Sequence, residues 1–318
     1  MEALITTFLL DRGWVDGSPE VSFLAAGEYN QNFLVRAGNE HLVFRINHGS
    51  QLGLADQIGY EFKVLRCVAP SGVTPRPLRV HSDLHPFGGG VLLMQYLPGS
   101  PLVYERDWER AAKIFARIHA LPPCQDLLTQ EDPVAAIASE SLALILRYPD
   151  HALTHQRNML LDYHERIVRL GEDNRLLFAA DRLCVVNTEV NSGNFLVTPK
   201  TAYLVDWEKA VLSSRHQDLG HFLAPTTTLW KTKTLFTAEQ KTDFLRLYHR
   251  QLQGPPPLND LLHLCRVMEQ VIILRGLSWC FMAHHEYAHA AKSLTDERTR
   301  ARIELYMRDM DRLIPAVS

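Results

Sequence analysis

Three polar residues that follow short apolar runs have types and a spacing that could do chemistry. Glu189 and Asn194 lie five positions apart after the apolar run 183–186, and Asp206 ends a second apolar run. A carboxylate can take the proton of an attacking hydroxyl, while an amide and a second carboxylate offer Mg²⁺ the hard oxygen ligands it prefers. This set predicts phosphoryl transfer, with Glu189 as the base and with Asn194 and Asp206 as magnesium ligands.

The loop at 187–194 resembles the His-Gly-Asp-x-x-x-x-Asn loop of the aminoglycoside phosphotransferase and choline kinase superfamily. It ends in the Gly-Asn pair of that pattern, at Asn194. The family's Ile-Asp-Phe/Trp motif is present around Asp206 as Val-Asp-Trp. The later Asp-Leu-Ala element is similar to the segment around Asp218, and the resemblance implies that Asp218 braces the loop through hydrogen bonds. The similarity covers roughly residues 20 to 250.

The loop departs from the family pattern at three consecutive positions. Asn187, Thr188 and Glu189 stand where the family has His, Gly and the catalytic Asp. Glutamate carries the same charge on one more methylene, so Glu189 could still act as the base from a differently placed oxygen. The change supports an alternative, a nucleotide-binding pseudokinase or regulatory module without turnover. A third hypothesis keeps Mg-ATP but transfers the nucleotidyl group.

The resemblance implies an α+β, protein-kinase-like fold with two lobes. A small antiparallel β lobe at 1–97 would bind nucleotide, and a larger, mostly helical lobe at 98–318 would carry the catalytic and acceptor-binding residues. The residue pattern agrees, because β-prone runs and one helical pattern at 54–68 precede a series of long helical patterns. The β-prone runs are 21–24, 32–36, 41–46 and 91–94, and the later helices are expected at 107–120, 133–147, 154–170, 237–252 and 258–290.

The small lobe holds the other candidate nucleotide contacts. Gly27 lies in a strand–turn–strand setting, where a glycine would let the backbone pass close to phosphate, and Asn30 or Asn32 could orient the turn. Arg45 on the third strand would neutralise the phosphates, braced by Glu61 on the following helix. An ordinary hairpin turn and an exposed Arg and Glu have the same sequence pattern.

The run 91–99 resembles the hinge between the lobes. There the adenine edge would be read by backbone groups near Gln95 and Leu97, with Met94 lining the pocket. Because backbone groups would do the reading, ATP is the expected nucleotide and GTP is left open. A core strand that ends in a Pro-Gly turn fits the same residues.

The expected acceptor is a hydroxyl group of a small molecule. Enzymes that phosphorylate polycationic aminoglycosides are expected to line the acceptor cleft with Asp and Glu. The helix expected at 258–290 instead offers mixed charge, which suits a neutral or anionic metabolite at least as well. Its candidate lining residues are Arg266, Glu269, Arg275, Trp279, His284 and Glu286.

Histidines at two places in the chain could be catalytic residues or metal ligands. The spacing of His119 from Phe115 and Ile118 favours a packed or capping residue over a catalytic one. The i, i+4 pair His285 and His289, with His284 beside it, could suggest a metal site. Because no His-Glu-x-x-His pattern accompanies them, we expect solvated helix residues.

The composition is that of a globular protein, with 46% hydrophobic and 22% charged residues. The net charge of −3 gives no electrostatic case for a nucleic-acid or membrane partner. The start of the chain predicts a short helix rather than a signal peptide, and no apolar run approaches the roughly eighteen residues of a membrane span. We therefore expect a cytoplasmic protein whose five scattered cysteines are free thiols. The sequence does not indicate an oligomeric state.

Overall fold

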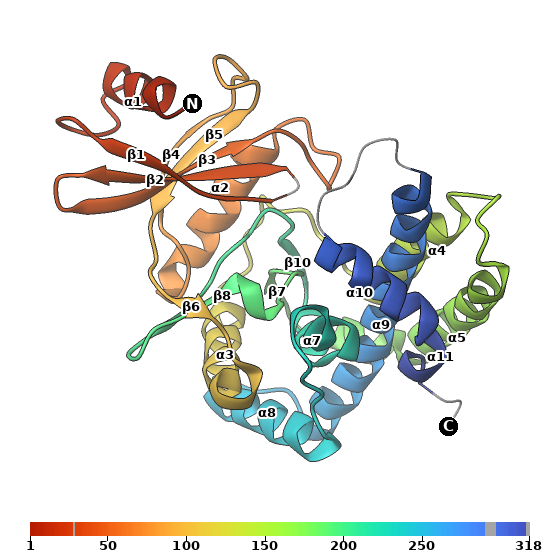
Figure 1. Ribbon diagram of the computed structural model, residues 1–318. Coiled ribbons are helices and arrows are strands. Elements are labelled where there is room, and N and C mark those ends of the chain that lie inside the picture. Colours follow the sequence, from red (N-terminus) through yellow and green to blue (C-terminus); the bar gives the residue numbers. More distant parts are fainter. Residues whose placement is uncertain (28, 290–296, 316–318) are drawn as a thin grey trace.

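The first sheet has two apolar faces, because successive residues of a strand point to opposite sides. In strand β3 (Glu40–Asn47), Val43 belongs to the core under helix α2 (Gln57–Val68), whereas Phe44 belongs to the core under helix α1 (Glu2–Asp11). Figure 1 shows these helices on opposite faces of the sheet. Burial on both faces explains why β3 is an almost continuous apolar run rather than an alternating one.

The sheet is antiparallel, with the strand order β1-β2-β3-β5-β4. Strands β2 and β3 form a hairpin whose Gly38 has φ 58°, as a two-residue turn between twisted strands requires. The four expected strands are confirmed. The remaining bounds are Glu20–Ala26 for β1, Asn30–Ala37 for β2, Pro77–His81 for β4 and Gly90–Gln95 for β5.

Strand β4 was not expected, because Pro75 and Pro77 indicated the end of regular structure. The strand is formed nevertheless, since it lies at the edge of the sheet and pairs only with β5. An edge strand needs hydrogen bonds on one side alone, and proline is tolerated there.

The large lobe is mostly helical, and the structure describes it together with the small lobe over residues 1–27, 29–289 and 297–315. Its helices are α3 Tyr104–His119, α4 Pro133–Leu146, α5 Thr154–Ala180, α6 His216–Leu223, α7 Pro225–Lys231, α8 Ala238–Gln251, α9 Leu258–His289, α10 Glu297–Arg308 and α11 Met310–Leu313. Its short strands are β6 Ser100–Pro101, β7 Leu183–Val186, β8 Phe195–Val197, β9 Ala202–Leu204 and β10 Val211–Ser214. None of the helices in these ranges is long and apolar enough to cross a membrane.

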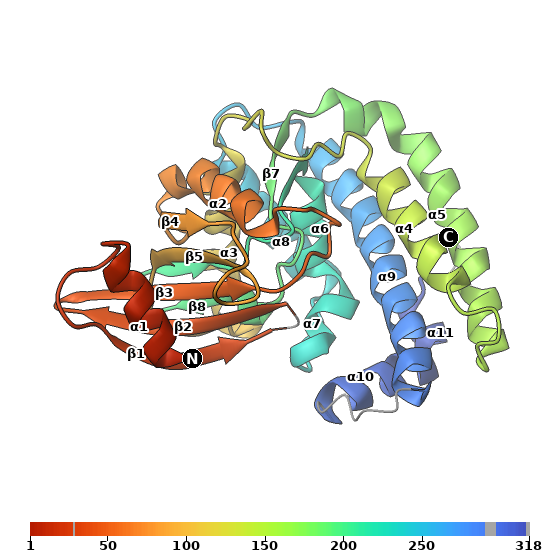
Figure 2. The same cartoon turned by 90° about the horizontal axis from the view of Figure 1, so that it is seen from above.

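Helix α9 is the central element of the large lobe. In the view from above it runs between α6 and α7 on one side and α4 and α5 on the other (Figure 2). Its expected apolar face is buried, with Leu261, Leu264, Val267, Met268 and Val271 each at most 2% exposed. The expected helices are confirmed, although α5 continues ten residues beyond the predicted end at 170.

Four phenylalanines pack together and join helices α3, α6 and α8 to strand β8. Phe115 of α3 packs against Phe195 of β8, Phe222 of α6 and Phe244 of α8, with ring centroids 5.6 to 6.3 Å apart. These rings lie within a few residues of His119, Asn194 and Asp218 in the sequence. The packing of these rings therefore fixes the relative positions of α3, α6 and β8, and with them the positions of His119, Asp218 and Asn194.

The expectation that all five cysteines are free thiols is wrong for two of them. Cys67 of α2 and Cys124, in the connection after α3, form a disulfide with Cα atoms 6.2 Å apart, while Cys184, Cys265 and Cys280 are buried free thiols. A separation of 57 residues gives no sequence signal for pairing, because only the fold brings the two residues together. The bond ties the helix of the small lobe to the large lobe.

We predict that removing this crosslink by the double substitution Cys67→Ser and Cys124→Ser lowers the free energy of unfolding by about 2–4 kcal/mol, because the unfolded chain gains conformational freedom. Urea denaturation of the oxidised protein and of the double variant measures the loss. Reductant should destabilise the parent protein and leave the double variant unchanged. Equal unfolding midpoints for the two proteins would contradict the prediction.

Candidate active site

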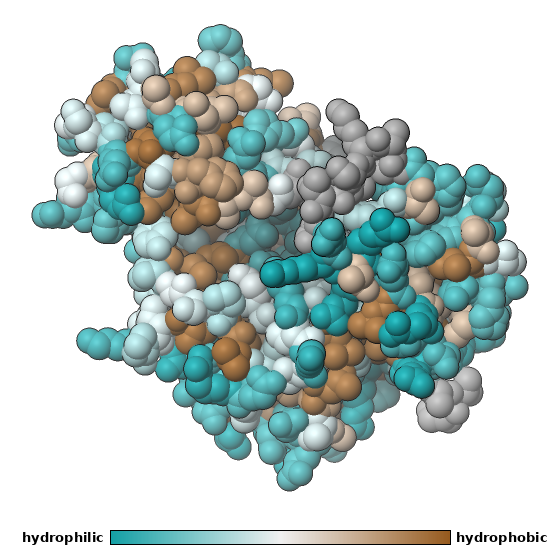
Figure 3. All heavy atoms as spheres, in the orientation of Figure 1, coloured by the Kyte–Doolittle hydropathy of each residue, from teal (hydrophilic) through white to brown (hydrophobic). Residues whose placement is uncertain are grey.

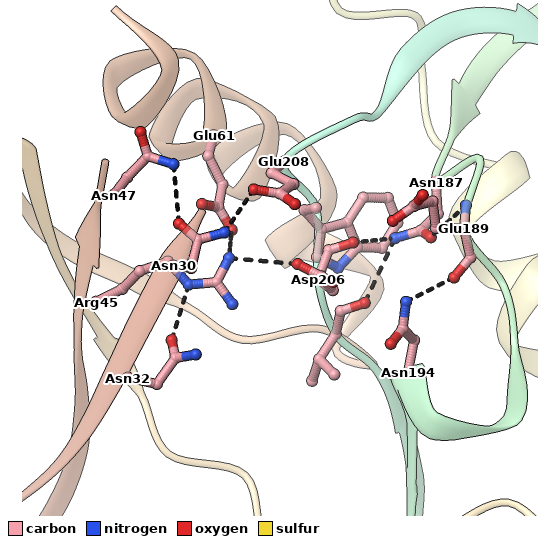
Figure 4. A network of polar contacts seen from close by, with 12 residues as sticks. Asn30, Asn32, Arg45, Asn47, Glu61, Asn187, Glu189, Asn194, Asp206 and Glu208 are labelled. Carbon is pink, nitrogen blue, oxygen red and sulfur yellow. Dashed lines mark hydrogen bonds and ion pairs between the residues drawn. The ribbon is translucent and has the colours of Figure 1, made fainter. Parts of the chain in front are cut away.

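Arg45 is a buried cation at the junction of the two lobes (Figure 4). Its Nε donates to Asn32 Oδ1 at 2.9 Å, and its Nη1 lies 2.5 Å from Glu61 Oε1 and 3.4 Å from Asp206 Oδ1. Burial alone would lower the pKa of Arg45, but the charges of Glu61 and Asp206 outweigh it and raise the pKa. The guanidinium therefore stays charged, and the expected contact between Arg45 and Glu61 is present.

A second set of contacts holds the segment after Asp206 against the small lobe. Asn30 Nδ2 donates to Glu208 Oε2 at 2.5 Å, and Asn47 Nδ2 donates to Asn30 Oδ1 at 2.9 Å. From α2, Gln57 Nε2 donates to the backbone oxygen of Glu208 at 2.7 Å. Asn30 therefore fixes a carboxylate of the opposite lobe, in addition to its place at the end of the β1–β2 turn, where its backbone oxygen accepts from Gly27 N.

Asp218 braces the loop at 187–194, as the resemblance implied. Its carboxylate accepts from the backbone N–H groups of Asn187 at 2.9 Å and Thr188 at 2.8 Å. His119 Nε2 lies 3.3 Å from the same carboxylate, and its Nδ1 lies 3.0 Å from Tyr248 Oη. Burial lowers the pKa of His119, so the packed role expected for it is confirmed. Asn187 occupies the position of the family's His and donates from Nδ2 to the backbone oxygen of Asp206 at 2.7 Å.

Thr188, at the position of the family's glycine, has a left-handed backbone conformation. Its φ is 69°, a left-handed value that is costly for a β-branched residue. Besides the bond to Asp218, its Oγ1 donates to the backbone oxygen of Lys209 at 3.1 Å, and its own backbone oxygen accepts from Arg275 Nη1 at 3.2 Å. These three hydrogen bonds hold Thr188 in the left-handed conformation.

Glu189 is held by a cation that the sequence analysis did not single out. Lys209 Nζ lies 2.5 Å from Glu189 Oε1. Burial alone would raise the pKa of Glu189, but the charge and hydrogen bond of Lys209 lower it below its ordinary value. Asn194 Nδ2 donates to the backbone oxygen of Glu189 at 2.7 Å, so Asn194 also braces the loop.

Three carboxylates meet beside this loop. One oxygen each of Glu189, Asp206 and Glu208 lies within 4.8 Å of the others. Burial and the charges of Asp206 and Glu61 raise the pKa of Glu208 to about 7, because the cluster lacks sufficient positive charge. Hard oxygen donors with unbalanced negative charge fit Mg²⁺. Sequence reasoning missed Glu208 and Lys209, although two charged residues directly after the Asp206-Trp207 motif were an available signal.

A cleft of about 440 Å³ lies over these residues. In Figure 3 the surface is hollowed between the small lobe, at upper left, and the helical lobe, at lower right. Of the expected site residues, the cleft is lined by Gly27, Asn30, Asn32, Arg45, Glu189 and Asp206. The other lining residues of the described chain include Glu140, Glu208, Lys209, His221, Thr226, Thr227, Trp230, Arg275, Trp279 and Tyr306. Glu61 and Asn194 are not among the lining residues but contact them, through Arg45 and through the backbone oxygen of Glu189.

The expected hinge contacts are not brought into this cleft. Met94 and Leu97 are buried, each 6% exposed. The backbone N–H of Gln95 already donates to Arg76 O at 2.9 Å, because β5 pairs with the unexpected strand β4. The Gln95 side chain lines a separate depression of about 520 Å³ on the outside of the sheet. The prediction that backbone groups near Gln95 and Leu97 read the adenine edge stays a prediction.

Of the acceptor residues expected on α9, the cleft contains Arg275 and Trp279 only. Glu269 is paired with Lys241 of α8 and lines a different depression together with Arg266. Glu286 accepts from Tyr148 Oη at 2.6 Å, far along the helix.

The prediction of solvated histidines is wrong for His285. Its ring stacks on Tyr148 and on His289 with centroids 4.1 and 4.0 Å apart, and the residue is 9% exposed. His285 and His289 are one helical turn apart, so the fold of α9 itself brings the rings together. The groups that could hold a metal among the described residues do not include these histidines.

A model of the phosphotransferase enzyme family matches residues 20–261. The chain belongs to this family. The matched range contains the small-lobe sheet, the catalytic loop and the segment with Asp206 and Asp218, which are the elements on which the resemblance in the sequence depended.

Solved structures of several kinases and phosphotransferases have a similar fold. The choline kinase from Cryptosporidium parvum is 16% identical, with a TM-score of 0.64 and with 98% of this chain and 96% of that chain covered. A choline/ethanolamine kinase family protein from Mesorhizobium loti is 21% identical, with a TM-score of 0.59 and coverage of 93% and 88%. Spectinomycin phosphotransferase APH(9)-Ia, in complex with ADP and spectinomycin, is 13% identical, with a TM-score of 0.59 and coverage of 98% and 94%. The expected kinase-like fold is thereby confirmed, and no curated protein matches the chain.

We predict that Asp218→Asn lowers the free energy of unfolding by about 2–4 kcal/mol. An amide can accept one of the two backbone N–H bonds, but its own NH₂ group then faces the other buried donor. Urea denaturation measures the loss. The matched control is Asp243→Asn on α8, whose carboxylate is 51% exposed and pairs only across one helical turn with Arg246, so its effect should stay within about 0.5 kcal/mol. Equal effects of the two substitutions would refute a bracing role.

Proposed function

We propose that this member of the phosphotransferase enzyme family is an ATP-dependent small-molecule kinase that transfers the γ-phosphate to a hydroxyl group. The observation that carries the proposal is the buried Arg45–Glu61 pair, which faces the carboxylates of Glu189, Asp206 and Glu208 across one cleft. A cation for phosphates, acidic oxygens for a metal and a carboxylate for a hydroxyl are the parts that phosphoryl transfer needs.

The nucleotide would lie between the lobes, with its phosphates beside Gly27 and Arg45. Asn30 and Asn32 support this position, because one holds Glu208 and the other holds the Arg45 guanidinium. ATP is the proposed donor, and its adenine would lie toward the segment that contains Gln95 and Leu97. A division of the chain into lobes at 1–97 and 98–318 follows from the same proposal. A cytoplasmic location is proposed because ATP would be the donor, although the Cys67–Cys124 disulfide is unusual for a reducing compartment.

Asp206 and Glu208 would hold Mg²⁺ with their carboxylates, with Asn194 supplying its amide oxygen. The bound ion would neutralise charge on the transferring phosphoryl group. Asp206 has φ 65°, a left-handed value that turns the segment so that its side chain reaches Arg45 and its backbone oxygen reaches Asn187. The same turn lets Glu208 meet Asn30.

Glu189 would accept the hydrogen bond of the acceptor hydroxyl and then its proton. Because the pKa of Glu189 is lowered, the carboxylate is ionised at neutral pH and can accept at once. A weakly basic carboxylate contributes mainly by orienting the hydroxyl, and Lys209 limits the freedom of the longer side chain. Rate enhancement would come mostly from positioning and charge neutralisation.

The alternative is a pseudokinase that binds nucleotide without turnover. Its support is the replacement of three consecutive residues at Asn187, Thr188 and Glu189. Against it, Asp218 binds the backbone N–H groups of both Asn187 and Thr188, and the carboxylate of Glu189 lies beside that of Asp206. Both candidate metal ligands of the sequence, Asn194 and Asp206, are present as well.

We predict that purified protein incubated with Mg-ATP and a set of hydroxyl-bearing metabolites releases ADP, and that Glu189→Gln lowers this rate roughly 10²- to 10⁴-fold while ATP affinity changes less than about twofold. Chromatographic product analysis makes the measurement. Glu172→Gln on α5, an exposed residue of the same type, is the matched control and should keep the full rate. Pyrophosphate would indicate nucleotidyl transfer, and ATP binding without any product would indicate a pseudokinase.

A further inference from the structure

The part of the cleft beyond Glu189 is a compartment with little net charge. Helices α4, α6, α7, α9 and α10 form its walls. Its carboxylates are Glu189, which Lys209 neutralises, and Glu140, whose side chain is 56% exposed. Burial and the charge of Arg275 lower the pKa of His221 to about 4, so this histidine is neutral at physiological pH. Among the described residues of these helices that line the compartment, none is a buried carboxylate without a cationic partner, so the compartment is poorly suited to a polycation.

Arg275 is the cation of this compartment with the most unused hydrogen-bonding capacity. Its side chain is 20% exposed, and its Nη1 donates to Thr188 O at 3.2 Å. Its Nε lies 4.0 Å from Glu140 Oε2, beyond hydrogen-bond distance. A guanidinium presents five N–H donors in a planar fork that matches a carboxylate. The largely buried charge therefore has room for an anion within the cleft.

Two threonines of α7 have side-chain hydroxyl groups without hydrogen-bond partners in the described part of the chain, and Thr226 packs against Gly276 of α9. The side-chain oxygens of Thr226 and Thr227 are buried, and both residues line the cleft. The residues are 6% and 5% exposed. A buried hydroxyl without a partner is costly, so these groups favour a ligand that supplies polar atoms.

The compartment also has an aromatic part, on α7, α9 and α10. The rings of Trp230 and Trp279 meet edge to face with centroids 5.7 Å apart, and Tyr306 packs on Trp230 at 5.8 Å. Trp279 is 37% exposed although it lies in the cleft. Because Trp279 and Arg275 are four residues apart on α9, the open indole and the guanidinium lie on the same helix face.

Given the proposed function, we infer that the acceptor is a hydroxy acid with an apolar or aromatic part. Its anionic group would bind Arg275, its apolar part would cover Trp279 and Trp230, and its hydroxyl would reach Glu189. Thr226 and Thr227 would bond polar atoms between these ends. In the transfer, the oxygen–phosphorus bond to the acceptor forms as the bond to ADP breaks, and the hydroxyl proton leaves to Glu189.

The anion at Arg275 has two possible sources, the acceptor and the γ-phosphate of the nucleotide. Phenyllactate, its neutral amide, and the amino alcohol in which an aminomethyl group replaces the carboxylate share one hydroxyl and one phenyl ring. Calorimetric titration of the three probes into protein saturated with Mg²⁺ and a non-hydrolysable ATP analogue compares anion, neutral compound and cation. Titration of the analogue alone tests the nucleotide site separately.

We expect phenyllactate to bind at least about tenfold more tightly than the amide, and the amino alcohol to bind most weakly. Arg275→Met should abolish this preference and leave nucleotide affinity within about twofold. Glu140→Gln should strengthen phenyllactate binding several-fold, because it removes the carboxylate that competes for Arg275. This exposed substitution is not expected to affect folding, and thermal unfolding checks both variants.

Equal affinity for the three probes, tighter binding of the amino alcohol, or no phenyllactate binding in a protein that still binds nucleotide would overturn the inference. If the parent protein shows no preference among the probes and Arg275→Met loses nucleotide affinity, the anion that binds Arg275 is the γ-phosphate. That result would also overturn the inference. Absence of nucleotide binding in the parent protein would instead refute the proposed function.

Discussion

The buried charge of Arg45 is the constraint on which the arrangement of the two lobes depends. A guanidinium that is 7% exposed needs nearby carboxylates, and leaving it unpaired would cost several kcal/mol. Glu61 supplies one from α2 and Asp206 supplies the other from the large lobe. One cation therefore sets the position of a strand, a helix and the segment that carries Asp206. The Cys67–Cys124 bond restrains the same helix from its other end.

The loop at 187–194 is held in place by hydrogen bonds from several elements. The left-handed backbone at Thr188 is kept because Asp218, Lys209 and Arg275 each bond to this residue. The longer side chain of Glu189 is kept in place by Lys209. Strain at one residue is thus offset by several hydrogen bonds, which is typical of functional sites. Arg275 contacts the loop through Thr188 and also lines the part of the cleft beyond Glu189, so one residue connects the two.

The parts of the site that follow from local spacing could be predicted from the sequence, and the parts that depend on backbone direction could not. The pair Arg45 and Glu61 and the bracing by Asp218 were found, because strand–helix order and the loop motif determine them. Glu208 joins the cluster because Asp206 adopts a left-handed conformation. Aspartate tolerates this conformation but adopts it only in some contexts, so the residue type alone did not predict the direction of the Glu208 side chain. The strand β4 and the disulfide were missed because both depend on distant partners.

The most direct test of this account is calorimetric titration of ATP, with and without Mg²⁺, into the parent protein and into Asp206→Asn. Asparagine tolerates the left-handed backbone at this position, so the substitution removes charge and preserves shape. The account predicts Mg²⁺-dependent ATP binding by the parent protein, reduced at least about tenfold in the variant. Thermal unfolding measures the stability that is lost with one carboxylate partner of Arg45 and shows that the variant is folded at the temperature of the titration. Absence of ATP binding by the parent protein, or equal Mg²⁺-dependent binding by both proteins, would contradict it.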